Sequence, residues 1–332
     1  MPTNRQWRLA SRPVGWVSED NFTLVEAPIP EPADGEVLVK NQWLSLDPYM
    51  RGRMSDQKSY APGLAIGDVM VGATVGEAQS SRHPAFKPGD HVLTQLGWQE
   101  YGCAPGHTLT KVDGSRAPLS YYLGLLGMPG LTAYFGLKEI GRPKPGDTAV
   151  VSAASGAVGS VVGQLAKISG CRAVGIAGGT AKCRYVVDEL GLDGCVDYKS
   201  GDLGAELARA CPAGVDVYFD NVGGPVLDAV LPQMNVASRL VVCGAIADYN
   251  STEPYGVTAW RSILTNRIRV QGMIVFDWQT QYAAALEVLA DYYAQGRLKT
   301  KESVVEGIER APQGLVALMK GQNFGKQLVK LA

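Results

Sequence analysis

The stretch from residue 148 to residue 179 constrains the fold of this chain more than any other part of the sequence. It opens with a short apolar run, Thr148 to Ala153, which is typical of a buried strand. A glycine-rich turn, a helical stretch and a second apolar run over Arg172 to Ala177 follow in order. The succession of strand, turn, helix and strand predicts a parallel β-α-β unit of the kind that binds dinucleotides.

The turn in this unit has the spacing A-x-G-x-x-G, formed by Ala154, Gly156 and Gly159. Gly156 would let the backbone approach a pyrophosphate, and Gly159 would let the helix pack closely on the strand. The helix N-terminus would then hold the anion. A glycine-rich turn without a ligand is the alternative interpretation, because the first glycine of the pattern is an alanine here. The flanking strands and helix favour nucleotide binding.

The remainder of the chain predicts two domains of different character. Residues 1–122 are rich in proline, glycine and short β-like segments (22–25, 36–39, 69–75, 91–93 and 109–112), which predicts a small β-barrel. From residue 123 strands and helices alternate, which predicts an α/β domain with a doubly wound parallel sheet. Its later elements are expected as helices over 180–190, 203–210 and 226–234, and as strands over 195–198, 215–219, 239–243 and 268–276. This domain is expected to end near residue 296, and the tail 297–332 could rejoin the barrel domain.

Charge and apolar patterning exclude several classes of partner. The formal net charge is −1 and no run of lysine or arginine occurs, so neither a nucleic acid nor an anionic membrane is expected as a partner. The apolar stretch over 148–166 is broken by glycine and serine and does not predict a membrane span. The N-terminal residues lack the apolar core of a signal peptide, so we expect a cytoplasmic protein.

The cysteines argue against a structural metal site. They are scattered without a C-x-x-C pair or a Cys/His cluster, which predicts free, mostly buried thiols in a reducing compartment and no zinc site. The six positions are Cys103, Cys171, Cys183, Cys195, Cys211 and Cys243.

The residues after the second strand discriminate between nicotinamide cofactors. An NAD-binding fold usually places a carboxylate there for the ribose hydroxyls, but this chain has Gly178, Gly179 and Thr180. Lys182 follows in the first helical turn, where a cation is unfavourable unless an anion lies nearby. A solvated surface lysine is the alternative. The missing acid and the misplaced cation together predict NADPH, whose 2′-phosphate would bind there.

Several longer motifs then carry a family resemblance that covers essentially the whole chain. They are LDPYMRGRM (46–54), LGMPGLTAYFGL (126–137), AASGAVGSVVGQLAK (153–167), FDNVGG (219–224), CGAIADYN (243–250) and NFGK (323–326). The chain resembles the zinc-free branch of the medium-chain dehydrogenase/reductase superfamily. This branch includes prostaglandin reductases, plant alkenal double-bond reductases and bacterial curcumin reductase.

The resemblance implies a GroES-like barrel joined to a Rossmann domain, with NADPH in the cleft between them and a homodimer formed by pairing of edge strands. It implies that Lys182 and Tyr198 hold the 2′-phosphate. Further cofactor contacts are implied for Met128, Thr132, Ala154, Gly156, Ala157, Val158, Gly159, Gly178, Asn221, Cys243, Ile246, Tyr249, Phe276 and Asn323. The chain departs from the family pattern at 178–181 and at Ala247, which bears on substrate preference more than on reaction type.

Reduction of a conjugated C=C bond suits a site without a metal. Hydride would reach the β-carbon while negative charge develops on the carbonyl oxygen, and neutral donors would stabilise that oxygen. Tyrosine is such a donor at neutral pH. By resemblance Tyr249 is the first candidate, with Tyr60 and Tyr49 as pocket residues of second rank, although each could simply pack in the core. The 2′-hydroxyl of the nicotinamide ribose is an alternative proton donor.

Four aromatic residues in the later part of the chain have two interpretations. Tyr255, Trp260, Phe276 and Trp278 could be core and loop anchors, or they could form a lid over an apolar substrate. We therefore expect an NADPH-dependent 2-alkenal or enone reductase acting on small to medium, apolar α,β-unsaturated carbonyl compounds. An NADPH:quinone reductase and an NADPH-binding protein without turnover are the alternatives.

Overall fold

The computed structural model describes residues 3–253 and 255–331. The chain forms two compact units, each described here by itself: the first unit comprises 1–124 and 302–332, and the second unit comprises 125–301. No helix in the described part of the chain is both long and apolar enough to cross a membrane.

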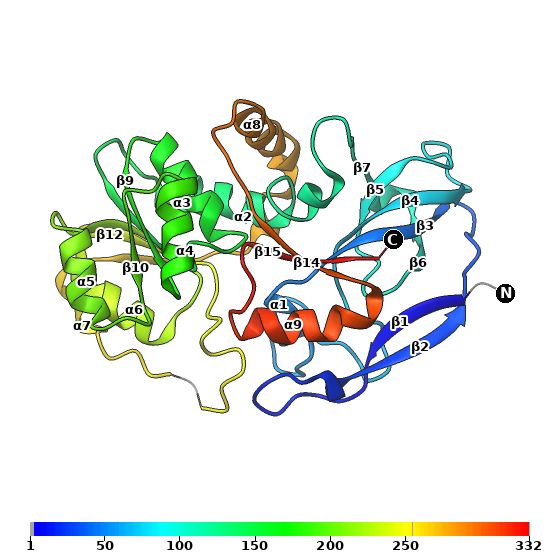
Figure 1. Cartoon of the computed structure of the whole chain (residues 1–332), viewed down its shortest axis with the longest axis horizontal. Helices are drawn as coiled ribbons and strands as arrows, with labels where there is room; N and C mark the ends of the chain where they lie inside the picture. The colour runs from blue at the N-terminus through cyan, green and yellow to red at the C-terminus, as the bar shows by residue number, and fades with distance from the viewer. Residues whose placement is uncertain (1–2, 254, 332) are drawn as a thin grey trace. The chain divides into compact units, whose positions relative to one another are not determined.

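The second unit is built on a six-stranded sheet in which every neighbouring pair of strands is parallel (Figure 1). In spatial order the strands are β10 (Gly194–Asp197), β9 (Arg172–Ala177), β8 (Thr148–Ser152), β11 (Val215–Asp220), β12 (Met234–Val242) and β13 (Arg269–Gly272). The order reverses between β8 and β11, as in a Rossmann fold. The predicted doubly wound sheet is confirmed.

Helices cover both faces of this sheet, because alternate residues of each central strand point to opposite sides. On β11, buried Tyr218 packs in a core with Leu207 and Val230 from two of the helices. Its neighbour Phe219 lies on the opposite face, where a Cβ on Gly136 would come within 2.6 Å of the ring. The helices are α2 (Met128–Phe135), α3 (Gly159–Ile168), α4 (Thr180–Arg184), α5 (Leu203–Ala210), α6 (Gly224–Val230), α7 (Arg261–Thr265) and α8 (Tyr282–Ala294).

Four predicted elements of the second unit differ from the structure by more than two residues at one end. The helix expected over 226–234 is α6, followed by a 3-10 turn over Leu231–Gln233, and the strand expected over 239–243 already begins at Met234 as β12. The helix expected over 180–190 stops being α-helical after Arg184 and continues as a π-helical turn, Tyr185–Glu189. The strand expected over 268–276 is only β13, and a 3-10 segment, Val275–Gln281, follows it. The apolar residues Met273 and Val275 are buried after the chain has left the strand, so core packing and not strand pairing explains their apolar pattern.

The first unit contains a seven-stranded sheet assembled from both ends of the chain (Figure 1). Its order is β14 (Glu302–Glu306), β15 (Lys326–Lys330), β3 (Glu36–Ser45), β4 (Thr74–Ser81), β5 (His91–Thr94) and β7 (Thr110–Lys111), with β6 (Tyr101–Pro105) also on β3. β1 (Thr3–Leu9) and β2 (Phe22–Pro28) form a separate pair, and the helices are α1 (Tyr49–Arg53) and α9 (Ala311–Met319). The predicted GroES-like barrel agrees with this arrangement.

Polar residues explain why β1 was not predicted as a strand. Asn4 in β1 is fully buried and its amide donates to the Tyr101 carbonyl oxygen at 2.9 Å, while Gln6 donates to Gln99 Oε1 at 2.8 Å. A buried strand with such residues lacks the apolar pattern that marks a strand. The strand expected over 69–75 lies instead at 74–81.

A buried ion pair fastens the end of the chain to the first unit. Lys326 in β15 places Nζ 2.7 Å from Asp47 Oδ1 and 2.8 Å from the Leu46 carbonyl oxygen. The two charged side chains are only 1% and 7% exposed, and the Ser45 hydroxyl donates to the other carboxylate oxygen. Burial lowers the pKa of Lys326, and the Asp47 carboxylate opposes that shift. Each charge therefore depends on the other.

We expect Asp47→Asn to lower the free energy of unfolding by about 3 kcal/mol, because it leaves a buried lysine without its counter-charge. Chemical denaturation measures this change. The matched control is Asp34→Asn, which removes the partner of Arg82 in an exposed ion pair and should leave stability nearly unchanged. The double variant Asp47→Asn/Lys326→Met should recover part of the loss. Equal stability of Asp47→Asn and the natural chain would contradict the role of the pair.

Candidate cofactor and active site

The turn between β8 and α3 is built on a left-handed alanine. Ala153 has φ 51°, and its carbonyl oxygen accepts the Gly156 N–H at 2.8 Å. A Cβ on Gly159 would lie only 2.3 Å from that same oxygen, so only glycine fits there. The sequence pattern begins at Ala154, but the structure places the unusual backbone one residue earlier. Ala154 is buried, and its methyl group lies 2.7 Å from where a Cβ on Gly175 would stand.

This turn presents hydrogen-bond donors at the start of α3. Across residues 3–253 and 255–331, no group accepts the backbone N–H of Ala157 or Val158. The first N–H groups of a helix have no partner within the helix and, together with the helix dipole, favour an anion. The structure therefore brings the predicted residues of the turn together as a site that fits a pyrophosphate.

The buried carboxylate of Asp220, at the carboxyl end of β11, organises the neighbouring strand ends. Its Oδ1 accepts the hydroxyls of Ser152 at 2.9 Å and Tyr218 at 2.8 Å, together with the N–H groups of Val222 and Gly223. Burial and the nearby carboxylate raise the pKa of Tyr218 well above its usual value, so this tyrosine stays a neutral donor. Asp220 was not predicted to be a structural centre, although it lies in the FDNVGG motif.

Asn221 follows Asp220 in the chain and is held in place by Ser152. Its side-chain amide donates to the Ser152 carbonyl oxygen and its backbone N–H donates to the Ser152 hydroxyl, both at 2.8 Å. This residue, predicted to contact the cofactor, is thus fixed at the switch point between β8 and β11. Ligands of doubly wound sheets bind at such points.

The loop after β12 runs beside residues 220–222. Cys243 N–H donates to the Asp220 carbonyl oxygen at 2.9 Å, and Ile246 N–H donates to the Asn221 carbonyl oxygen at 3.4 Å. Burial, with a smaller contribution from the Asp220 carboxylate, raises the pKa of the Cys243 thiol to about 12, so it is not a nucleophile at neutral pH.

Tyr249 lies in the same loop, and its hydroxyl contacts two residues near the start of that loop, Gly244 and Ala245. The Ala245 N–H points to its hydroxyl oxygen at 3.4 Å, and a Cβ on Gly244 would lie 3.2 Å from that oxygen. The ring is half-buried. The structure thus brings Tyr249, Cys243, Ile246 and Asn221 together at the carboxyl ends of β11 and β12.

Two lysines, Lys182 after β9 and Lys199 after β10, form a lysine cluster at the ends of these strands. Tyr198 packs so closely on Gly178 that a Cβ there would lie 2.8 Å from the ring. Lys199 places Nζ 5.8 Å from the centre of the Tyr198 ring. Burial lowers the pKa of Lys182, and the positive charge of Lys199 lowers it further. An anion here would relieve that repulsion, so the donor set fits the 2′-phosphate of NADPH.

Lys199 was not predicted as part of this cluster. The carboxylate of Asp197 fixes the backbone around it, because Oδ1 accepts the N–H of Gly179 at 2.8 Å and the N–H of Lys199 at 3.0 Å. The available sequence signal was only its position beside Tyr198.

Three further predicted cofactor residues of the second unit lie apart from these clusters. Thr132 in α2 is buried and donates its hydroxyl to the Met128 carbonyl oxygen at 2.8 Å. Phe276 is 52% exposed and lies in the 3-10 segment after β13. Their contacts with a cofactor stay predictions.

The first unit carries the other predicted residues. Tyr49 begins α1, and its pKa is raised by burial and by the nearby Asp47 and Tyr60, so it is a neutral hydroxyl close to Tyr60. Tyr60 is 55% exposed. Asn323 precedes β15, and its amide donates to the Gly325 carbonyl oxygen at 2.7 Å. The catalytic roles of the two tyrosines and the cofactor contact of Asn323 stay predictions.

Two of the four aromatic residues considered as a lid are anchors. Trp278 stacks on Phe135 with 5.6 Å between ring centres. The Tyr255 hydroxyl donates to the Asp228 carboxylate at 2.9 Å, which also accepts the Ala259 N–H at 2.9 Å. Trp260 is 66% exposed.

The prediction of six free cysteines is wrong for two of them. Cys183 in α4 and Cys195 in β10 form a disulfide. The sequence hides this pair because the two residues lie on different elements that meet only in the fold. The predicted cytoplasmic location relied partly on unpaired cysteines and stays a prediction. Among the described residues, no group of three or more His, Cys, Asp or Glu side chains is arranged to hold a metal ion.

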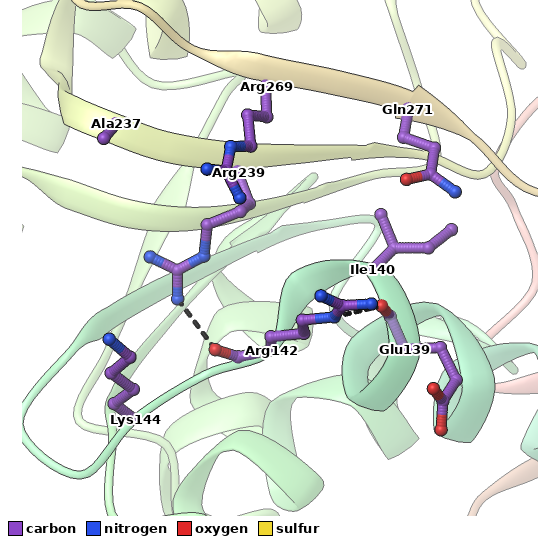
Figure 2. Close-up of a pocket in the computed structure, with 8 residues that line it drawn as sticks. All are labelled: Glu139, Ile140, Arg142, Lys144, Ala237, Arg239, Arg269 and Gln271. Atoms are coloured by element: carbon purple, nitrogen blue, oxygen red, sulfur yellow. Dashed lines mark hydrogen bonds between the residues drawn. The ribbon is translucent and has the colours of Figure 1, made fainter.

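None of the residues of these clusters lines the pocket of about 380 Å³ whose lining is drawn in Figure 2. Arg269 is the first residue of β13 and pairs with Arg239 of β12, whereas Cys243 and Tyr249 follow the carboxyl end of β12. Arg239 is held by Asp147 at 2.6 Å and by the Gly141 carbonyl oxygen at 2.8 Å. The pocket includes none of the predicted site residues. Its lining is Glu139, Ile140, Arg142, Lys144, Ala237, Arg239, Arg269 and Gln271.

Comparison with known proteins defines the class. Residues 5–112 match a family described as the N-terminal domain of oxidoreductases, and residues 157–291 match one described as zinc-binding dehydrogenase. The chain is 46% identical to an NADPH-dependent curcumin reductase of Escherichia coli over 99% of this chain and 97% of that protein. It is 42% identical to an NADP(+)-dependent 2-alkenal reductase of Nicotiana tabacum, over 99% and 98%. The crystal structure of CurA from Vibrio vulnificus in complex with NADPH superimposes with a TM-score of 0.94 at 47% identity, over 99% of both chains.

The chain therefore belongs to the medium-chain dehydrogenase/reductase family, in the zinc-independent branch that contains these reductases. The resemblance inferred from the sequence motifs is confirmed.

We expect Gly159→Ala to destabilise the second unit by about 2 kcal/mol or more, since its Cβ would collide with the Ala153 carbonyl oxygen. Binding of NADPH, measured by fluorescence titration, should weaken as the turn shifts. The matched control is Gly194→Ala in the same unit, where a Cβ would have no atom within 4 Å. Similar behaviour of the two variants would contradict the close approach at Gly159.

Proposed function

We propose that this protein reduces the C=C bond of small to medium, apolar α,β-unsaturated aldehydes and ketones, with NADPH as its cofactor. The observation that carries the proposal is the full-length similarity to reductases named for curcumin and for 2-alkenals, joined to a lysine cluster that fits the extra phosphate of NADPH. The curcumin reductase and the 2-alkenal reductase are named for different unsaturated carbonyl compounds, so the shared conjugated group defines the substrate class.

The residues of the second unit suit NADPH along one edge of the sheet. Donors at Ala157 and Val158 would hold the pyrophosphate, and Lys182 with Tyr198 would hold the 2′-phosphate. Asn221, fixed on Ser152, would contact the nicotinamide half. When bound, NADPH supplies a hydride to the β-carbon of the conjugated system.

The contribution of the protein is to stabilise charge on the carbonyl oxygen. As the β-carbon accepts hydride, electron density moves to that oxygen, and a neutral hydroxyl donor stabilises it without deprotonation. We assign this donor to the Tyr249 hydroxyl, which the loop after β12 positions through the contact with Ala245. Protonation of the α-carbon completes the reduction. Tyr249 is the first candidate for the source of that proton, and the 2′-hydroxyl of the nicotinamide ribose is the alternative.

Oxidation of NADPH followed at 340 nm tests the function. Purified protein should oxidise NADPH rapidly with 2-alkenals and with curcumin-like dienones, and slowly with quinones. Faster turnover of quinones at equal NADPH would favour a quinone reductase. Retention of NADPH without oxidation across the enone panel would favour a binding protein.

We also propose a homodimer formed along β13. This strand is an edge of the six-stranded sheet, and all four of its residues are exposed in the single chain. An exposed edge strand presents unpaired backbone groups, which a second copy can satisfy.

We expect Lys182→Ala to raise KM for NADPH about tenfold or more, because hydrogen bonds to charged groups contribute roughly 1.5–3 kcal/mol. KM for NADH should change little, since NADH lacks the 2′-phosphate. Steady-state kinetics with both cofactors measures the difference. Lys138→Ala serves as control, because it also removes a lysine charge, but from a side chain that donates to Tyr134 in α2 and does not belong to the lysine cluster. Equal effects of Lys182→Ala on the two cofactors would refute the phosphate assignment.

We expect Tyr249→Phe to lower kcat for enone reduction about 100-fold, as for the loss of one donor to a developing oxyanion. KM for NADPH should stay near its original value. Tyr255→Phe, which removes only the hydroxyl that donates to Asp228, is the matched control and should keep most activity. An unchanged kcat in Tyr249→Phe would assign the donor role elsewhere.

A further inference from the structure

The disulfide of the second unit lies between the two segments that carry the lysine cluster. Cys183 follows Lys182 directly in α4, and Cys195 lies in β10, three residues before Tyr198. The two Cα atoms are 5.2 Å apart, which is within the usual range for a disulfide. The pair is separated by only 12 residues of sequence, and both side chains are half-buried, so small reagents can reach them.

A hydrogen bond links the same two segments beside the disulfide. Asp197, at the end of β10, accepts the N–H of Gly179, which directly precedes α4. Tyr198 in turn packs on Gly178. The covalent link and this hydrogen bond together set the distance between α4, which carries Lys182, and the end of β10, which carries Tyr198.

We propose that Cys183 and Cys195 are a thiol–disulfide exchange site, and that its oxidised form strengthens the binding of NADPH by holding Lys182 and Tyr198 in place. This inference rests on the proposed assignment of those two residues to the 2′-phosphate. The reactant is a small-molecule disulfide of the glutathione class, and the opposite reaction takes a small dithiol.

The exchange takes place in two steps, each an attack of a thiolate on a disulfide sulfur. The thiolate of one cysteine attacks a sulfur of the small disulfide, whose S–S bond breaks and releases one small thiolate. The second cysteine thiolate then attacks the protein sulfur of the mixed disulfide and releases the second small thiolate. The protein loses two protons and two electrons, and the small disulfide gains them as two thiols.

The other cysteines are poor competitors for this reaction. Burial raises the pKa of Cys171 and Cys211 to about 11, and it also raises the pKa of Cys103 and Cys243. These groups stay protonated at neutral pH, where thiolates are the reactive form. A change in the thiol count on mild oxidation therefore reports the pair.

The test compares the full chain after treatment with oxidised glutathione and after reduction with dithiothreitol. Thiols titrated in denaturant should number four in the oxidised form and six in the reduced form. Reduction should raise the Kd for NADPH about fivefold or more, the lower end of coupling between sites, and leave the Kd for NADH unchanged. At saturating NADPH, kcat with a 2-alkenal should not change.

Single variants locate the effect. Cys183→Ser and Cys195→Ser should each bind NADPH as weakly as the reduced form and should not respond to either treatment. Cys103→Ser, a half-buried cysteine of the first unit, is the matched control and should keep the full response.

Three results would overturn the inference: six thiols after oxidation, equal NADPH affinity in both forms, or a preserved response in Cys195→Ser. Each of these can occur while enone reduction remains intact, so they leave the proposed function standing. Loss of enone turnover with a preserved redox effect on NADPH affinity would refute the proposed function alone.

Discussion

The second unit depends on one buried negative charge, the carboxylate of Asp220, which is 1% exposed. A charge this deeply buried needs hydrogen-bond donors, and it receives them from the hydroxyls of Ser152 and Tyr218 and from two backbone N–H groups. Since Ser152 ends β8 and Asp220 ends β11, the charge locks together the two strands at which the order of the sheet reverses. The same residue holds the loop after β12 through its carbonyl oxygen.

Parallel strands explain why the proposed functions gather at one edge of this sheet. All carboxyl ends of such strands meet there, so each strand contributes a different chemical feature. The turn after β8 offers backbone donors, the ends of β9 and β10 offer lysines, and the loops after β11 and β12 offer Asn221 and Tyr249. Under the proposed assignment, neutral hydroxyl and amide donors would lie at the reacting end and cations at the phosphate end, which is the charge distribution that reduction of an enone by NADPH requires.

Local patterns predicted the regular elements of the second unit well. The helix over 203–210 is α5, and the strand over 215–219 is β11 extended by one residue, because the apolar residues of each follow the pattern expected of that element. The apolar run after Gly272 was misleading because Met273 and Val275 are buried where the chain has already left the strand, and apolar residues in such a segment have the same composition as those of a strand. In β1, polar residues such as Asn4 are buried through hydrogen bonds to distant residues, which no local pattern records.

The site was predicted only in part, because local sequence patterns do not record contacts between distant residues. Glycines with required backbone geometry, such as Gly159, and a lysine in an unfavourable place, such as Lys182, leave a signature in the sequence. Asp220, Lys199 and the Cys183–Cys195 pair acquire their roles from contacts between separate elements. Such contacts exist only after folding, so the sequence presents these residues as ordinary members of a strand, a helix or a turn.

The most direct test of the account follows the transferred hydrogen. NADPH that carries deuterium at its transferable position should be supplied with a 2-alkenal in ordinary water, and the product analysed by NMR. We predict a saturated aldehyde with deuterium on the β-carbon and hydrogen from water on the α-carbon. Deuterium on the carbonyl carbon of an alcohol that retains its C=C bond would contradict this prediction.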